Sequence, residues 1–228
     1  MCEDNRGALV IWHDTPVDVE ERADMLAWYD HQHHPERVAI PGFLGVCRYH
    51  AVAAPRELFI RYRTSDAAVL SSPPYRARVD DPTAWSRRCQ PRIRNNSRTV
   101  CAVLARSGMG EGGFVATVAF AAEAWDEALA ARGWHSLTEL AKRHPALVSV
   151  EMLAADRSLS GLPSTEKDLR GAADEHVGGL FILHASDLDA LRQALAQWRD
   201  DWAVAASAAP ATIGLFALAF RLDRNAAG

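Results

Sequence analysis

The chain has 228 residues and a formal net charge of −4, with 49% hydrophobic and 24% charged residues. This length can bury one large core or two smaller ones, and the composition is ordinary for a globular protein. The net charge gives no electrostatic reason to expect nucleic acid as a partner. No apolar run approaches a membrane span, and residues 1–4 lack a basic-then-apolar signal, so we expect no membrane partner and a cytoplasmic location.

The first half of the chain alternates between strand-like and helix-like patterns. Acidic residues after Val17 mark a good helix start, because they complement the positive end of the helix dipole, and Pro35 is predicted to end that helix. The predicted strands lie near residues 8–13, 43–51, 57–64 and 98–106, and the predicted helices near 18–34 and 74–88.

The second half repeats this order after a glycine-rich linker at 108–112. Trp28 and Trp134 follow the first strand of each half at the same distance, and Leu58-Phe59-Ile60 is echoed by Leu180-Phe181-Ile182. The predicted strands lie near 113–121, 147–156, 178–185 and 212–222, and the predicted helices near 123–143 and 187–205. Each half therefore has the split βαβ order of a ferredoxin-like domain.

These patterns predict an α+β protein of two ferredoxin-like βαββαβ repeats in one chain. We expect an N-terminal repeat at 1–107, a linker at 108–112 and a mainly structural C-terminal repeat at 113–228. Each sheet carries helices on one face, so the two free faces are predicted to pack sheet to sheet as a pseudo-dimeric α+β barrel. Edges or helices could then support a further homodimer.

A long polar connection at 159–177 interrupts the second half between two predicted strands. Connections of this length inside compact domains are commonly functional loops or disordered segments. We expect this one to be mobile and to border the mouth of a cavity.

Three histidines lie within four residues at the predicted end of the first helix. His33 falls on the same helical stripe as Met25, Leu26 and Tyr29, whereas His31 and His34 are expected to be solvated. Histidine titrates nearest neutrality, so a histidine here suits proton transfer, although a satisfied core histidine would give the same pattern.

The surrounding sequence resembles the EthD-like group of the dimeric α+β barrel superfamily. The resemblance covers most of residues 7–106 and rests on Trp28-Tyr29-Asp30, His33, Pro35-Glu36-Arg37, Pro41-Gly42-Phe43 and Arg48-Tyr49, with a second block from Pro82 through Trp85 to Thr99. It implies a small-molecule enzyme, because relatives include dehydratases, isomerases and cofactorless monooxygenases. Gln32 departs from the pattern, since an acid often precedes the histidine, and its role would pass to Asp30 or be absent.

The predicted catalytic group is His33 with Asp30 and Tyr29. Helical spacing places both neighbours beside the imidazole, so Asp30 could orient it and Tyr29 could donate to a developing oxyanion. The second copy has Glu139 where the first has His33, which favours one site in the N-terminal half. Further side chains are predicted to bind substrate: Trp28, Tyr62, Arg37, His13, Tyr75 and Trp85.

We therefore expect a cofactor-independent lyase, dehydratase or isomerase acting on a small aromatic or polyketide-like molecule. Two alternatives remain open: a haem-binding or monooxygenase-type barrel, with His176 or His184 as further histidines, and a non-catalytic binding protein. We expect no metal, because no third ligand accompanies the histidines and the four cysteines lack paired metal spacing. Cys47 and Cys101 lie in strand-like runs and are predicted to be inert buried thiols.

Overall fold

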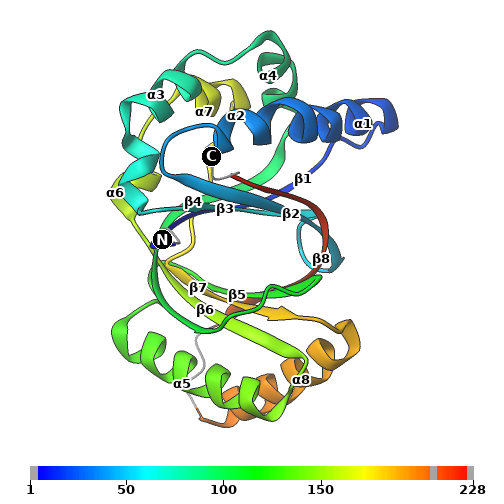
Figure 1. Cartoon of the computed structure of the whole chain (residues 1–228), viewed down its shortest axis with the longest axis vertical. Coiled ribbons are helices and arrows are strands. Elements are labelled where there is room, and N and C mark those ends of the chain that lie inside the picture. Colours follow the sequence, from blue (N-terminus) through cyan, green and yellow to red (C-terminus); the bar gives the residue numbers. More distant parts are fainter. Residues whose placement is uncertain (1–4, 206–209, 225–228) are drawn as a thin grey trace.

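The computed structural model describes residues 5–205 and 210–224, which form two layers of helices on either side of a β-barrel (Figure 1). Cys2 lies outside the described residues. The strands of the described part are β1 (Gly7–Asp14), β2 (Phe43–Ala53), β3 (Leu58–Thr64), β4 (Arg94–Gly108), β5 (Phe114–Phe120), β6 (Leu147–Ala155), β7 (Gly179–Ala185) and β8 (Ala211–Asp223).

The barrel is closed in the order β1-β3-β2-β8-β5-β7-β6-β4, and every pairing is antiparallel. Each repeat contributes four neighbouring strands, and the β2–β8 and β4–β6 pairs join the repeats. This confirms the predicted fold of two ferredoxin-like repeats forming a pseudo-dimeric α+β barrel. Closure leaves no free edge among the described strands, so a further homodimer could form only through other surfaces.

The first helix differs from the prediction at Pro35. Helix α1 (Val19–Trp28) runs into a π-helical turn, η1 (Tyr29–His33), and then into α2 (His34–Val38). Pro35 therefore does not end the helix: it lies in the first turn of α2, directly after the π turn. Asp18 caps the start of α1 by accepting from the backbone N–H groups of Glu20 and Glu21, as its acidic first turn predicted.

The predicted helix at 74–88 is two helices. Helix α3 (Pro73–Asp80) ends before Pro82, and α4 (Ala84–Cys89) begins after Thr83, whose hydroxyl accepts from the N–H of Ser86. Short 3₁₀ turns, η2 (Ala67–Ser71) and η3 (Gln90–Arg92), flank the pair. The C-terminal repeat instead has two long helices, α5 (Glu127–Arg143) and α8 (Leu188–Ala205).

The connection at 156–178 crosses to the N-terminal repeat. It forms α6 (Arg157–Ser160) and α7 (Thr165–Arg170), which lie beside α3 and α4 in Figure 1, away from α5 and α8. Its backbone is fastened to β4, since Arg98 donates to the Glu175 carbonyl and Glu175 donates to that of Asn96. The expected mobile loop is therefore an anchored, partly helical segment. The repeat boundaries stay a prediction, because this segment belongs to the second repeat in sequence and packs on the first.

Three apolar clusters form the interior. One lies between the N-terminal sheet and its helices, one between the C-terminal sheet and α5 and α8, and one inside the barrel. Cys47 and Cys101 are buried free thiols in the barrel, as predicted. No helix in the described part of the chain is both long and apolar enough to cross a membrane.

The echoed runs Leu58-Phe59-Ile60 and Leu180-Phe181-Ile182 occupy equivalent strands but face opposite ways. Phe59 points into the barrel, whereas Phe181 packs against the C-terminal helices. A shift of one residue exchanges the faces of a strand. His184 consequently faces the barrel interior, although it lies on the strand equivalent to that of Tyr62, which faces the helices.

Candidate active site

The π-helical turn η1 brings two consecutive histidines into the N-terminal core. His33 is 7% exposed and His34 is fully buried, whereas His31 is exposed. In an α-helix, successive side chains point about 100° apart around the axis. The π turn is wider, so a different set of side chains faces the core. The expectation that His34 is solvated was therefore wrong. π turns inside helices are frequent at functional sites.

His13, at the end of β1, forms a hydrogen-bonded pair with Tyr29. Its Nδ1 lies 3.0 Å from the backbone carbonyl of Asp14, which can only accept, so the neutral imidazole carries its proton there. Its Nε2 then accepts from the Tyr29 hydroxyl at 2.8 Å. This uses the only O–H of Tyr29, so Tyr29 is not the free oxyanion donor that its helical spacing predicted.

His34 forms the second histidine–tyrosine pair. Its Nδ1 lies 2.7 Å from the hydroxyl of Tyr62, on β3. The rings of Tyr29 and Phe220 stack on the imidazole, with centroids 4.8 and 5.4 Å away. Its Nε2 is buried without a hydrogen-bond partner. The ring is thereby held by contacts on both faces and at one edge.

His33 packs against the indole of Trp28, with ring centroids 4.3 Å apart. Its Nδ1 is sealed from solvent and has no hydrogen-bond partner. Nε2 is not sealed, and no described side chain bonds to it, which leaves Nε2 as the nitrogen available to a bound molecule. Among His13, His33 and His34, His33 is thus the one with a ring nitrogen that is neither sealed nor hydrogen-bonded within the described residues.

Burial keeps all three imidazoles neutral. Desolvation lowers the pKa of His13 from 6.5 to about 4. It also lowers the pKa of His33 and His34 well below 6.5, and the positive charge of Arg37 adds to the effect at both. Desolvation raises the pKa of Tyr29 and Tyr62, so both stay phenols. Near pH 7 the site therefore holds neutral bases beside cationic arginines.

Asp30 does not orient His33. Both of its carboxylate oxygens accept from the Arg48 guanidinium on β2, at 2.7 and 2.9 Å. The predicted base–orienter pair assumed the three-residue spacing of an α-helix, and the π turn removes that neighbour relation.

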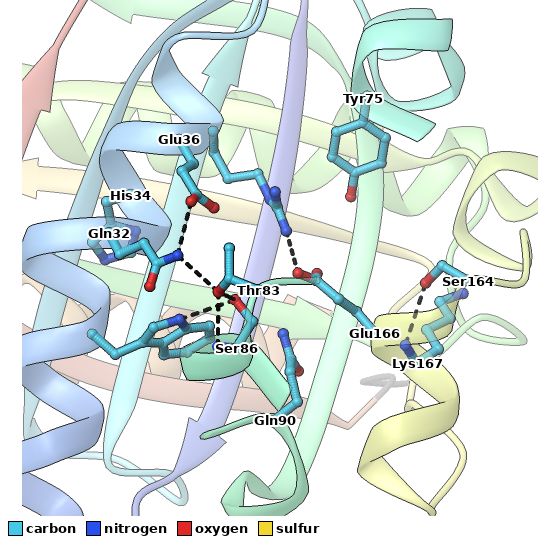
Figure 2. A network of polar contacts seen from close by, with 12 residues as sticks. Gln32, His34, Glu36, Tyr75, Thr83, Ser86, Gln90, Ser164, Glu166 and Lys167 are labelled. Carbon is cyan, nitrogen blue, oxygen red and sulfur yellow. Dashed lines mark hydrogen bonds and ion pairs between the residues drawn. The ribbon is translucent and has the colours of Figure 1, made fainter. Parts of the chain in front are cut away.

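Arg37 is buried and forms an ion pair with Glu166 of α7, from the crossing segment (Figure 2). Although burial alone lowers the pKa of Arg37, Glu166 more than compensates and raises it. The guanidinium also lies over the ring of Tyr75, 5.9 Å from its centroid. Arg170, four residues after Glu166, donates to the Gln90 amide oxygen at 3.0 Å and pairs with Asp174.

Glu166, Arg170 and Gln90 were missed by the sequence reasoning. Glu166 lies 129 residues from its partner Arg37. It comes from a polar segment without regular periodicity, so no local pattern marks it. Only the crossing of 156–178 over the first repeat brings this carboxylate to the site.

A hydroxyl and amide network supports the π turn from outside (Figure 2). Gln32 donates to Glu36 at 2.9 Å and to the Thr83 hydroxyl at 2.7 Å, and the indole N–H of Trp28 donates to Ser86 at 3.2 Å. Trp28 is therefore a buried wall of the site. Trp85 is not part of it, because its indole donates to Asp24 of α1 at 3.0 Å, between α1 and α4.

The described residues contain no group of three or more His, Cys, Asp or Glu side chains arranged to hold a metal ion. Haem needs a histidine nitrogen with open space in front of it. Nδ1 of His33 and Nε2 of His34 have no partner, but both are sealed by packed side chains. The imidazole of His33 also packs against the indole of Trp28. His33 and His34 therefore do not fit haem ligation in this conformation.

Comparisons with known proteins show the fold. No family model and no curated protein matches the chain. Among solved structures, an anthrone oxidase-like protein has 12% identity and a TM-score of 0.63, covering 98% of this chain and 95% of its own.

Two further structures are similar over nearly their whole length. A candidate monooxygenase from Lactobacillus acidophilus has 8% identity and a TM-score of 0.56, covering 96% of this chain and 97% of its own. A novel haem-binding protein from Thermus thermophilus has 11% identity and a TM-score of 0.51, covering 97% and 93%. The chain thus shares the dimeric α+β barrel fold with monooxygenase-like and haem-binding proteins, and identities this low leave its reaction open.

Proposed function

We propose that this chain is a cofactor-independent enzyme that removes a proton from a small aromatic or polyketide-like molecule, with His33 as the base. The observation that carries the proposal is the uncommitted Nε2 of a buried, neutral imidazole on a π-helical turn. A neutral imidazole can accept a proton from a bound molecule.

The low pKa of His33 suits a reaction in which proton removal creates an anion beside it. Arg37 and Arg170 lower the pKa of the free imidazole through their positive charge. The same charges would stabilise an enolate or phenolate in the site. Once the anion forms, its negative charge offsets the arginines and favours the imidazolium, so the proton and the anion stabilise each other.

The roles of the neighbours follow from their contacts. Tyr29 and Tyr62 hold His13 and His34 in position, and Trp28 forms the wall on which His33 rests. Arg37 is the proposed substrate-binding cation. Tyr75 supports the guanidinium from one side, and Glu166 balances its charge until an anion binds.

The anion has two chemical outcomes. Reprotonation elsewhere or loss of a leaving group gives an isomerase or a lyase, which is the outcome we favour. Reaction of the anion with dioxygen gives a cofactorless monooxygenase, an alternative supported by the fold shared with monooxygenase-like proteins. Both outcomes begin with the same proton transfer to His33.

Turnover of a panel of phenols, anthrones and β-keto aromatic compounds tests the proposal, in air and under argon. We expect His33→Ala to lower kcat by about 10²–10⁴, the usual contribution of a general base. His31→Ala is the matched control, because His31 is exposed two residues earlier on the same turn. Equal activity in His33→Ala and wild type would refute the base. Turnover that needs air would select the monooxygenase.

A further inference from the structure

The barrel interior has two unlike ends. One part of the lumen is filled by the ionisable side chains of Arg61, Glu151 and His184, and Arg61 pairs with Glu151. At the other end, marked by Trp12 on β1, a cavity of about 170 Å³ opens between strands of both repeats. This cavity lies on the opposite face of the N-terminal sheet from the histidine site.

The cavity has aromatic and small side chains on its walls. Trp12 stacks on Phe59 with ring centroids 5.1 Å apart, and Phe59 contacts Phe216. Gly214 leaves room for the Phe216 ring, because a Cβ at that position would lie 2.5 Å from it. Ala119 adds no bulk on the facing strand β5. These walls therefore offer aromatic and small side chains to a bound ring.

The polar side chains of Ser97, Thr117 and Trp12 line this space. Ser97 and Thr117 are each 2% exposed, and Trp12 is 6% exposed. Neither hydroxyl takes part in a side-chain hydrogen bond within the described chain, and neither does the Trp12 indole N–H. Buried hydroxyl and indole groups normally find partners, so these are arranged to meet one in the cavity.

The charges at the mouth are already neutralised. Arg56 pairs with Glu175 and donates to the backbone carbonyl of Asn95 at 2.7 Å, and His176 contacts the carbonyl of Arg98 at 2.6 Å. A carboxylate or ammonium group entering the lumen would find no opposite charge. A neutral molecule with one hydrogen-bonding group suits the lining better.

We propose that the barrel lumen is a second ligand site, which takes an uncharged single-ring aromatic alcohol such as a phenol. Its volume is close to that of an engineered apolar cavity of about 150 Å³ that binds benzene. The ring would lie against Trp12 and Phe216, and its hydroxyl would bond with Thr117 or Ser97. This inference does not depend on the proposed function, because the two sites lie on opposite faces of the sheet.

Titration of the full-length protein with 4-fluorophenol, followed by ¹⁹F NMR, tests the site. We expect saturable binding, weaker binding of fluorobenzene, which lacks the hydroxyl, and weaker binding of 4-fluorobenzoate, which is charged. Thr117→Leu fills the cavity and should weaken 4-fluorophenol binding at least tenfold. Thr117→Val keeps the volume, removes the hydroxyl and should have an intermediate effect.

His33→Ala locates the probe, since it alters the histidine site and leaves the lumen unchanged. Retained binding in His33→Ala with loss in Thr117→Leu supports the luminal site. Loss in His33→Ala with retention in Thr117→Leu overturns it, and so does tighter binding of the benzoate or no binding of the phenol. If Thr117→Leu fails to fold by circular dichroism, Ala119→Val fills the same cavity and takes its place.

Discussion

The two repeats share one fold, yet their helix layers differ in chemistry. Under the C-terminal helices α5 and α8 the core is apolar and rich in leucine, phenylalanine and tryptophan. The buried histidine among the described residues of this repeat, His184, faces the barrel interior instead. Under the N-terminal helices, three histidines, three tyrosines and Arg37 are buried. The helix α5 is regular, whereas α1 passes through a π turn.

This difference shows how a duplicated fold can specialise one copy. Glu139, which the shared tryptophan aligns with His33, is half-exposed and pairs with Lys142 on the surface. The C-terminal copy nevertheless contributes to the site of the first, because its crossing segment supplies Glu166. One copy therefore carries the proposed chemistry, and the other completes its charge balance.

The largest expected effect comes from removing the extra residue of the π turn. Deletion of His31 should restore regular α-helical bonding, turn His33 and His34 out of register and abolish turnover. His31→Ala keeps the residue count and should retain activity. Far-ultraviolet circular dichroism checks that the helix content is kept. Full activity in the deletion variant would show that the π turn is not required.

Loss of the buried ion pair should destabilise the protein strongly. Glu166→Ala leaves the Arg37 charge buried and unpaired, which costs about 3–5 kcal/mol of the free energy of unfolding. Glu139→Ala breaks the exposed Lys142 pair in the other repeat and should leave that free energy unchanged. Urea denaturation measures both. Similar values for the two variants would mean that the crossing segment contributes little.

The free energy of unfolding should decrease as the pH is lowered, because the N-terminal repeat buries neutral histidines. Unfolded histidines bind protons below their ordinary pKa of about 6.5, whereas His13 resists protonation until about pH 4. Stability is therefore complete above pH 6.5 and decreases toward pH 4, by about 3 kcal/mol for His13. Urea denaturation between pH 7 and 4 checks this, and His13→Gln should reduce the dependence. A flat profile would contradict burial of the neutral form.

The smallest expected effect is the change in the absorption spectrum of the protein when haemin is added. The sealed nitrogens of His33 and His34 predict no Soret band that stays with the protein through desalting. Ultraviolet–visible spectra before and after desalting measure it. A stable band that disappears in His34→Ala, but not in His31→Ala, would show that the packed rings open to admit haem.

Much of the fold could be predicted because strand alternation, helical periodicity and the repeated order are local properties of the chain. His33 could be singled out in the same way, from its apolar stripe. The partners of the site could not be predicted, because Asp30 was assigned from ideal helix spacing and the real turn is a π turn. His13 was predicted to take part, but its burial and its bond to Tyr29 depend on helix packing.

By itself the sequence determined the two repeats, their barrel and the residue types that can transfer protons, since periodic burial follows directly from side-chain polarity. Only the tertiary structure decided which side chains meet. Helix geometry turned His34 inward, and the crossing of α7 joined Glu166 to Arg37 across 129 residues. Such contacts depend on packing between distant segments, which no local pattern encodes.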